Sequence, residues 1–325
     1  MQELIRPDHV KSKSYGHQAY TFSLFVALPT IVPPHTEEIM KKIILALTLL
    51  LVTAITGCDS GPKQQSAPIQ ALSIKGSDTM VHLVSSWTEE FMKAHAEADI
   101  SVTGGGSGTG IAALINGTTD ICAASRGMQE KEQKLAAANK VSPVEIPVAR
   151  DGIALIVHPG NPVNSLTIDQ LRQIYTGKVT NWKEVGGADT PILLLSRESS
   201  SGTFVFFQEH VLNKEDFSAS ARLLPGTSAL VQAVAADRGA IAYVGLGFAA
   251  EAQGKAKTLG IQAKDQPSPV VPSEETVRSG AYAVSRPLFF YTNGAPKDTA
   301  KQFIDFCLSP AGQKIVKETG YVPIS

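Results

Sequence analysis

The sequence has almost no net charge and few large aromatic residues. Its 29 lysines and arginines nearly balance its 30 aspartates and glutamates, which leaves a formal charge of −1. A chain without excess positive charge has no broad field that attracts nucleic acid, so we expect no nucleic-acid partner. Two tryptophans and seven tyrosines among 325 residues argue against an aromatic groove for sugars or peptides. Any bound anion must therefore be held by local groups.

Cysteine is also scarce. The three cysteines are Cys58, Cys122 and Cys307. No Cys-x-x-Cys pair or histidine-rich spacing is present, so we expect neither a metal nor a cofactor. Cys122 and Cys307 lie in apolar segments, which predicts small buried side chains. A disulfide between these two cysteines is left open by the sequence.

The N-terminal region contains an apolar run too short to remain as a membrane-spanning helix. Lys41 and Lys42 precede the run Ile43–Ile55, and Thr56-Gly57-Cys58 follows it. A membrane-spanning helix needs about 20 apolar residues, whereas this order is typical of a signal peptide over residues 40–57. Its end resembles a bacterial lipobox, in which Cys58 is lipidated. We expect an exported protein on the outer face of the cell membrane, anchored through Cys58; a plain secretory signal is the alternative.

The residues around this signal have simpler interpretations. Met40 directly precedes the two lysines, so we expect translation to begin there and residues 1–39 to be a non-native extension. Residues 58–70 are rich in glycine, proline, glutamine and serine, which is typical of a flexible tether.

The rest of the chain alternates strand-like and helix-like segments, which favours an α/β fold with a mostly parallel sheet. We predict two α/β lobes, residues 71–151 plus 284–325 and residues 152–283, with a hinge and a central ligand cleft between them. The strands that we expect are 71–75, 100–103, 120–124, 144–149, 152–158, 192–196, 240–244 and 287–291, and the helices are 81–95, 111–116, 130–139, 168–175, 204–211, 228–236, 298–308 and 310–319. Thr167 and Ser228 are predicted caps of two of these helices.

Three Gly/Ser/Thr loops each stand between a predicted strand and a predicted helix. They read GSDTM at residues 76–80, GGGSGTGI at 104–111 and RESSSGTF at 197–204. Such a loop presents N–H groups and hydroxyls at the positive end of a helix dipole, where an oxyanion binds. Arg197 adds a side chain that can contact two oxygens of a tetrahedral anion. The three loops together predict a site for a small anion.

The second loop does not match better-known glycine motifs. A phosphate-binding P-loop needs Lys-Ser/Thr after its last glycine, but Ile111 follows Gly110. A dinucleotide fingerprint and a nucleophile elbow both need glycine where Thr109 stands. Two plainer interpretations stay open: this loop is a tight turn without a ligand, and Ser201 only caps a helix while Arg197 pairs with an acid.

Several long segments resemble a known family. GSDTM, GGGSGTGIAALINGTTDICAASR, RDGIALIVHPGNPV, LTIDQLRQIYTGKVTNWKEVGG, SRESSSGTF and SRPLFFYTNGAPKDTAKQFIDFCLSPAGQKIVKETGYVP stand in this order from Ala71 onward. Together they resemble the phosphate-binding proteins that serve phosphate-specific ABC transporters. The resemblance implies a periplasmic-binding-protein type II fold, inorganic phosphate as ligand and a transporter permease as partner. It implies a monomer without enzymatic activity.

The resemblance also implies which residues hold phosphate. They are Thr79, Ser107, Arg197, Ser201, Gly202 and Thr203, and we add Ser77 and Gly108 from the same loops. Longer members of the family carry an aspartate after the third strand that accepts the proton of phosphate, but this chain reads Ala124-Ser125-Arg126 there. We therefore expect Ser125 and Arg126 to contact the ligand and Asp151 to be the proton acceptor.

Three other functions remain to be distinguished. The same fold can bind another tetrahedral oxyanion, such as sulfate, molybdate or tungstate. A phosphatase would need Ser107 or Ser201 as nucleophile, although no histidine stands beside either serine in the sequence. A lipoprotein that binds phosphate can also act only as a sensor or an adhesin.

Overall fold

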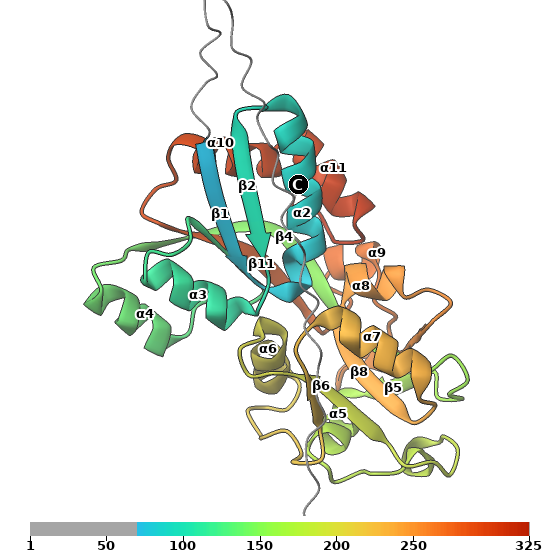
Figure 1. Ribbon diagram of the computed structural model, residues 1–325. Coiled ribbons are helices and arrows are strands. Elements are labelled where there is room, and N and C mark those ends of the chain that lie inside the picture. Colours follow the sequence, from blue (N-terminus) through green and yellow to red (C-terminus); the bar gives the residue numbers. More distant parts are fainter. Residues whose placement is uncertain (1–69, 325) are drawn as a thin grey trace, which may run out of the picture. The chain divides into compact units, whose positions relative to one another are not determined.

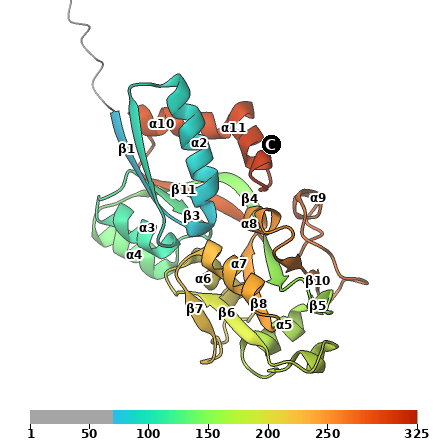
Figure 2. The same ribbon diagram turned by 45° about the vertical axis from the view of Figure 1, so that its right-hand side comes forward.

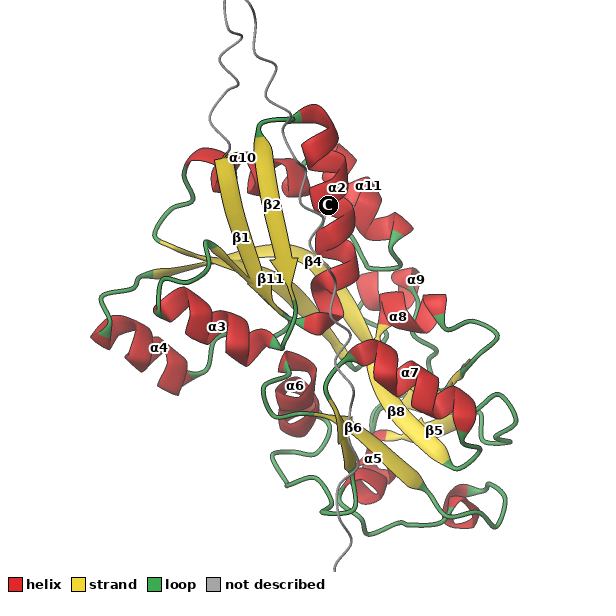
Figure 3. Ribbon diagram, in the orientation of Figure 1, coloured by secondary structure: helices red, strands yellow, loops and turns green. Residues whose placement is uncertain are grey.

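The computed structural model describes residues 70–324, and a mixed nine-stranded sheet forms the framework of this part (Figures 1 and 3). The strand order is β2-β1-β3-β11-β4-β8-β6-β7, and β9 pairs with β4. These strands are β1 (Gln70–Gly76), β2 (Ala98–Thr103), β3 (Ile121–Ala124), β4 (Pro143–Val157), β6 (Leu193–Arg197), β7 (Arg222–Leu224), β8 (Ala240–Gly245), β9 (Lys257–Thr258) and β11 (Ser285–Asn293). A small separate sheet pairs β5 (Ser165–Thr167) with β10 (Gly260–Gln262).

Helices cover this sheet on both faces (Figure 2). They are α2 (Val81–Ala94), α3 (Ser107–Ile115), α4 (Glu130–Ala138), α5 (Ile168–Tyr175), α6 (Gly202–His210), α7 (Thr227–Ala236), α8 (Leu246–Glu251), α9 (Glu274–Arg278), α10 (Asp298–Leu308) and α11 (Pro310–Glu318), with short 3-10 turns η1 (Asp78–Met80) and η2 (Trp182–Val185). No helix among the described residues is long and apolar enough to span a membrane. The predicted extension, the signal peptide and Cys58 lie outside these residues, as does the predicted tether except for Gln70, which begins β1.

The sheet is built around one long strand that was predicted as two. Residues 143–152 of β4 pair antiparallel with β11, and residues 153–157 pair antiparallel with β8. The chain stays extended between these parts because Arg150 and Asp151 continue the ladder opposite Pro287 and Arg286. β4 therefore runs through both halves of the sheet without a break.

The prediction of a mostly parallel sheet was wrong. The strands β1, β2 and β3 pair in parallel, as do β6, β7 and β8. However, β11 returns from the C-terminal part of the chain between β3 and β4 and runs antiparallel to both. An apolar run indicates a buried strand but carries no information on its direction, so the sequence pattern did not reveal this insertion.

The first lobe consists of β1–β3, the first part of β4, β11 and the helices α2–α4, α10 and α11. Alternate residues of its strands point to opposite faces of the sheet. On one face, Ile121 and Phe290 pack with side chains of α2, α10 and α11. On the other face, Cys122 and Tyr291 pack with α3 and α4. We call this part lobe I.

The second lobe contains the rest of β4 with β5–β10 and α5–α9. Leu155 and Tyr243 face the core that α5 and α6 cover. Their neighbours Ile156 and Val244 face the opposite side, where α7 lies. We call this part lobe II. The two lobes with helices on both faces of a shared sheet confirm the predicted α/β two-lobe fold class.

Some helix starts agree with the sequence prediction and others differ from it. The Thr167 side chain accepts a hydrogen bond from the Gln170 N–H, as expected for the cap of α5. Ser228 is not a cap, because α7 begins at Thr227 with Gly226 at the N-cap position. The helices α3 and α6 begin earlier than their apolar patterns suggest, at Ser107 and Gly202. Their first turns are therefore made of the loop residues themselves.

Both described cysteines are buried free thiols. Burial raises the pKa of Cys122 and of Cys307 well above the ordinary value of a thiol. Cys122 packs with α3 and α4, whereas Cys307 packs on the opposite face. They act as small core side chains, as predicted, and the structure contains no disulfide between them.

One buried hydrogen bond joins α2, from the beginning of lobe I in the sequence, to α11 at its end. The indole Nε1 of Trp87 in α2 donates to the carbonyl oxygen of Gly312 in α11, at 2.8 Å. Replacing Trp87 with phenylalanine removes this bond but leaves the Gly312 carbonyl its partner within the α11 helix, which costs about 0.5–1.5 kcal/mol. We expect that loss in the free energy of unfolding, measured by urea denaturation. A Trp87→Phe protein as stable as the parent would show that the bond contributes nothing.

Candidate anion-binding site

Hydroxyl groups from three strand ends of lobe I meet in the interior. The Ser77 Oγ donates to the Ser125 Oγ at 2.8 Å, and the Ser125 Oγ lies 3.3 Å from the Ser107 Oγ. The backbone N–H of Ser125 donates to Ser107 at 3.0 Å. These three serines are at most 2% exposed. The parallel pairing of β1 with β3 places their carboxyl ends side by side, which explains the convergence.

The third predicted loop, from lobe II, lies directly against these serines. The hydroxyls of Thr79 and Thr203 are 2.8 Å apart, and the N–H of Gly108 donates to the carbonyl oxygen of Ser200 at 2.9 Å. A Cβ atom on Gly202 would stand 2.3 Å from the Ser107 Oγ. The lobes thus touch through the loops that the sequence singled out, and this contact leaves no space for a side chain at residue 202.

Ser201 caps α6, as the plainer interpretation of this loop suggested. Its Oγ accepts hydrogen bonds from the N–H groups of Thr203 at 3.2 Å and Phe204 at 3.4 Å. A hydroxyl that accepts two bonds keeps its own proton. Ser201 can therefore cap the helix and still donate a hydrogen bond to an anion.

Arg197 is buried at the end of β6 and joins the two lobes. Its Nη2 donates to Asp78 in lobe I at 2.5 Å and to the Pro225 carbonyl oxygen at 2.8 Å, and its Nη1 donates to Thr227 at 2.9 Å. A guanidinium has five N–H donors, so Nε–H and one Nη1 hydrogen remain. The buried Nε has no partner. Arg197 does pair with an acid, as the alternative held, yet it keeps donors for an anion.

Arg126 is held by an acid on its own lobe. Its Nη1 and Nη2 donate to the two carboxylate oxygens of Glu132, each at 2.7 Å. This pairing fixes the side chain, which is only 6% exposed, while the Nε is buried and without a partner. The Nη1 also donates to the Gly127 carbonyl oxygen at 2.9 Å, so the Nε hydrogen and one Nη2 hydrogen remain for other contacts.

Asp151 lies on β4 where this strand passes from lobe I to lobe II. Its Oδ2 accepts from the Nη2 and Nε of Arg286, at 2.9 and 3.2 Å, and its Oδ1 accepts from the N–H of Leu246 at 2.9 Å. Complete burial raises the pKa of Asp151 above the ordinary value of aspartate, and the guanidinium of Arg286 limits this rise. Asp151 thus has partners within the protein, and its role as proton acceptor stays a prediction.

Comparisons with known proteins place this arrangement in a family. The model of the PBP superfamily domain matches residues 61–311. The phosphate-binding protein PstS of Pseudomonas aeruginosa PAO1 is 31% identical over 310 residues, which cover 88% of this chain and 95% of the relative. PstS of Staphylococcus haemolyticus is 32% identical over 297 residues, with coverages of 87% and 93%. The chain belongs to the PstS family of phosphate-binding proteins.

Solved structures support the membership of this chain in the PstS family. A phosphate ABC transporter substrate-binding protein from Clostridium perfringens, solved with bound phosphate, has a TM-score of 0.72 and 32% identity, covering 79% of this chain and all of that chain. An ABC-type phosphate transport receptor from Vibrio cholerae has a TM-score of 0.62 and 28% identity, with coverages of 77% and 99%. The predicted periplasmic-binding-protein fold is confirmed, and the family is one of substrate-binding proteins rather than enzymes.

Two polar residues of this PstS-family site were absent from the sequence prediction. Asp78 pairs with Arg197 across the lobes, and Arg286 reaches from β11 to Asp151 and to the Thr203 hydroxyl, at 3.0 Å for the latter. Asp78 could have been noticed as the acid inside the GSDTM loop. Arg286 directly precedes the predicted strand 287–291, but only the register of β11 against β4 brings it opposite Asp151.

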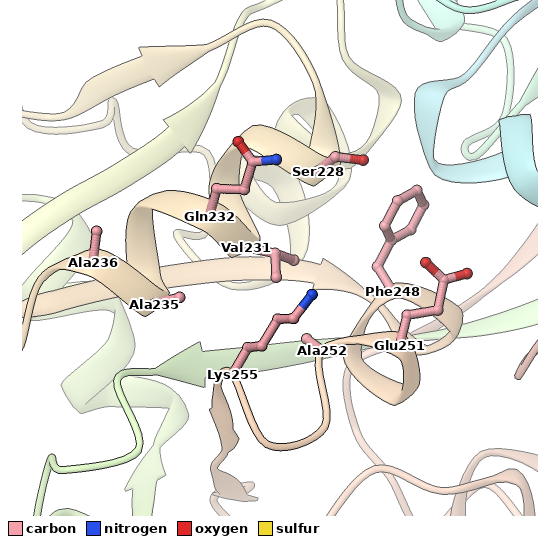
Figure 4. Close-up of a pocket in the computed structure, with 9 residues that line it drawn as sticks. All are labelled: Ser228, Val231, Gln232, Ala235, Ala236, Phe248, Glu251, Ala252 and Lys255. Carbon is pink, nitrogen blue, oxygen red and sulfur yellow. The ribbon is translucent and has the colours of Figure 1, made fainter.

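Other features of the described chain lie apart from these loops. No group of three or more histidine, cysteine or acidic residues in the described part is arranged to hold a metal. A pocket of about 420 Å³ lies between α7 and α8 on lobe II (Figure 4). None of the predicted site residues lines it; its walls are Ser228, Val231, Gln232, Ala235, Ala236, Phe248, Glu251, Ala252 and Lys255.

Proposed function

We propose that this protein captures inorganic phosphate between its lobes and delivers it to the permease of an ABC transporter for import. The observation that carries the proposal is the convergence of the three loops with Arg197, across the two lobes, in one buried place. The bound phosphate reported for the Clostridium perfringens relative supports the same ligand. Binding, rather than catalysis, is the role that follows.

The proposed site is sufficient for tight binding without a large positive field. Hydrogen bonds to charged groups contribute about 1.5–3 kcal/mol each, and a micromolar dissociation constant needs about 8.2 kcal/mol in total. About three to six such bonds supply this free energy. The starts of three helical segments and one arginine provide more hydrogen-bond donors than this. The residues that we assign to phosphate are Ser77, Thr79, Ser107, Gly108, Ser125, Arg126, Asp151, Arg197, Ser201, Gly202 and Thr203.

Capture requires the lobes to open and close. The proposed hinge comprises residues 150–152 and 283–286. It separates lobe I, residues 71–151 plus 284–325, from lobe II, residues 152–283. Two observations support this position. β4 exchanges its pairing partner from β11 to β8 between Gly152 and Ile153, and the buried pair of Asp151 and Arg286 lies at the same level.

The cellular setting rests on the sequence. The proposal places a monomeric protein on the outer, extracytoplasmic face of the cell membrane, held there by a lipid on Cys58. Growth with labelled palmitate tests this proposal, because Cys58→Ser should abolish incorporation of the label and release the protein into the soluble fraction. Continued membrane attachment of the Cys58→Ser protein would contradict it.

Selectivity for phosphate over sulfate is assigned to Asp151. Phosphate near neutral pH carries at least one proton, whereas sulfate carries none, so a buried carboxylate accepts a hydrogen bond only from phosphate. We expect Asp151→Asn to lower the preference for phosphate over sulfate about tenfold, since a hydrogen bond from phosphate to a charged carboxylate is worth about 1.5–3 kcal/mol. Competition calorimetry measures the ratio, with the exposed Asp305→Asn as control. Unchanged competition by sulfate would remove Asp151 from this role.

The proposed function is tested by calorimetry of the purified protein with phosphate, sulfate, molybdate and arsenate. Phosphate should bind in the micromolar range or tighter, and sulfate and molybdate more weakly. Tightest binding of sulfate or molybdate would assign the site to another oxyanion. Turnover of an aryl phosphate by the same sample would assign an enzyme instead.

A further inference from the structure

Arg286 connects the hinge to the proposed phosphate site through a single nitrogen. Its Nη2 donates to the Asp151 Oδ2 at 2.9 Å and to the Thr203 Oγ1 at 3.0 Å. Arg286 and Asp151 lie on the paired strands β11 and β4, whereas Thr203 lies in the first turn of α6 on lobe II. The three residues are at most 2% exposed. Arg286 therefore stands between a buried carboxylate and a hydroxyl of the third loop.

The bond from Arg286 fixes the direction of the hydrogen bonds around Thr203. A guanidinium has donors but no acceptor, so the Thr203 oxygen must accept from it. The same oxygen lies 2.8 Å from the Thr79 Oγ1 of lobe I. Each hydroxyl has one proton, so one proton fills the bond between the threonines and the other has no acceptor within residues 70–324. Because a buried donor without an acceptor is unfavourable, this proton favours a ligand oxygen between the loops.

Arg286 also keeps the Asp151 carboxylate apart from this pair of hydroxyls. The Asp151 and Thr203 oxygens contact the same nitrogen, so the carboxylate is the next acceptor near Thr203 once that nitrogen is removed. Ionised carboxylates accept stronger hydrogen bonds than neutral hydroxyls do, and the Thr203 proton would then turn toward Asp151 and away from the loops. The positive charge acts in the same direction, because a hydroxyl that accepts from a charged donor is polarised and itself donates more strongly.

We propose that Arg286 is a positioning residue of the anion site, which acts through the Thr203 and Thr79 hydroxyls and holds one of their protons toward a ligand oxygen. The identity of the ligand rests on the proposed function. The ligand oxygen beside the two threonines is then an unprotonated one, which both phosphate and sulfate supply. Arg286 therefore contributes affinity for the anion, whereas the role assigned to Asp151 is selectivity for phosphate.

A double-mutant cycle on the whole protein tests the action through Thr203. Arg286→Met keeps the side-chain length but removes the donors, so phosphate should bind about tenfold more weakly, as for the loss of one hydrogen bond to a charged group. In the Thr203→Val background, Arg286→Met should cost about threefold or less, because only the loss of charge remains. Calorimetry measures the dissociation constants, with the exposed Arg222→Met as matched control. An equal cost in both backgrounds would overturn the proposal.

A spectroscopic measurement separates positioning from a contribution to lobe closure. The phosphorus NMR resonance of bound phosphate depends on the hydrogen bonds that its oxygens accept. At saturating phosphate, we expect the bound resonance to move in the Arg286→Met protein and to return toward the parental position in Arg286→Lys, which restores a charged donor. The affinity should recover with it. A weakened affinity with a parental resonance would assign Arg286 to closure alone and would contradict the proposal.

A second variant removes the risk that Arg286→Met leaves a buried carboxylate without its cation and fails to fold. The double replacement Asp151→Asn/Arg286→Met is compared with Asp151→Asn alone, and it should show the same loss of about tenfold for phosphate and for sulfate. No loss, or a loss for phosphate alone, refutes this inference but leaves the proposed function intact. If the parent protein does not bind phosphate, the proposed function fails and the cycle is run with the oxyanion that binds; failure to bind any oxyanion refutes both.

Discussion

Replacing Arg197 with alanine is expected to weaken phosphate binding about a hundredfold, because it removes one or two hydrogen bonds to a charged ligand worth about 1.5–3 kcal/mol each. The Nε and one Nη1 hydrogen of Arg197 are the donors that the protein itself does not use. The change also removes a buried positive charge that the Asp78 carboxylate balances directly. Calorimetry on the variant measures the dissociation constant.

Two control variants separate ligand contact from lobe closure. Arg222→Ala removes an exposed arginine of β7 and should leave phosphate affinity unchanged. Asp78→Asn weakens the bond between the lobes but keeps Arg197, so its effect on affinity should be much smaller than that of Arg197→Ala. A near-native dissociation constant for Arg197→Ala would refute its role as a ligand residue. Equal losses for Asp78→Asn and Arg197→Ala would assign Arg197 to closure alone.

Replacing Gly202 with alanine is expected to prevent closure and to weaken phosphate binding by about a hundredfold or more, the loss of about 2.7 kcal/mol or more. The added Cβ would stand 2.3 Å from the Ser107 Oγ and 2.7 Å from the Ser125 Oγ, both on the opposite lobe. These side chains are fully buried and hydrogen-bonded to each other and to Ser77. Contact between the lobes would therefore be lost before the ligand is enclosed.

The same substitution should not harm the fold of lobe II. Gly202 is the first residue of α6, and alanine favours a helix by about 1 kcal/mol over glycine. We expect an unchanged or slightly higher midpoint of thermal unfolding without ligand. Small-angle scattering should show compaction on phosphate addition in the parent protein but not in the Gly202→Ala variant. Gly226→Ala is the matched control, because its Cβ meets no atom within 4 Å. Phosphate-dependent compaction of Gly202→Ala at parental affinity would contradict the prediction.

Local sequence patterns predicted most elements of the fold. The three- and four-residue spacing of Leu83, Val84, Trp87 and Phe91 places one buried face on α2, as observed. The caps were harder to predict, because a serine such as Ser228 is a typical cap, whereas α7 has Gly226 at this position. The continuous strand β4 was missed for a different reason: Arg150 and Asp151 are charged, and charged residues are normally read as the end of a buried strand.

Some features of the candidate site could be recognised in the sequence and others could not. The loops could be recognised because glycine, serine and threonine at a helix start have a local physical meaning that does not depend on the rest of the chain. The partners of the charged residues could not be recognised. Glu132 lies six residues from Arg126, whereas Asp78 lies 119 residues from Arg197, and Asp151 lies 135 residues from Arg286.

The sequence by itself therefore determined the α/β character of this protein, the positions of the three Gly/Ser/Thr loops and the resemblance to phosphate-binding proteins. Only the tertiary structure decided that β11 inserts antiparallel between β3 and β4, and that Asp151 meets Arg286 where β4 passes between the lobes. Local backbone preferences and side-chain chemistry are encoded in neighbouring residues, so a pattern can reveal them. Strand direction, register and contact between lobes arise from packing of distant segments, and no local pattern contains them.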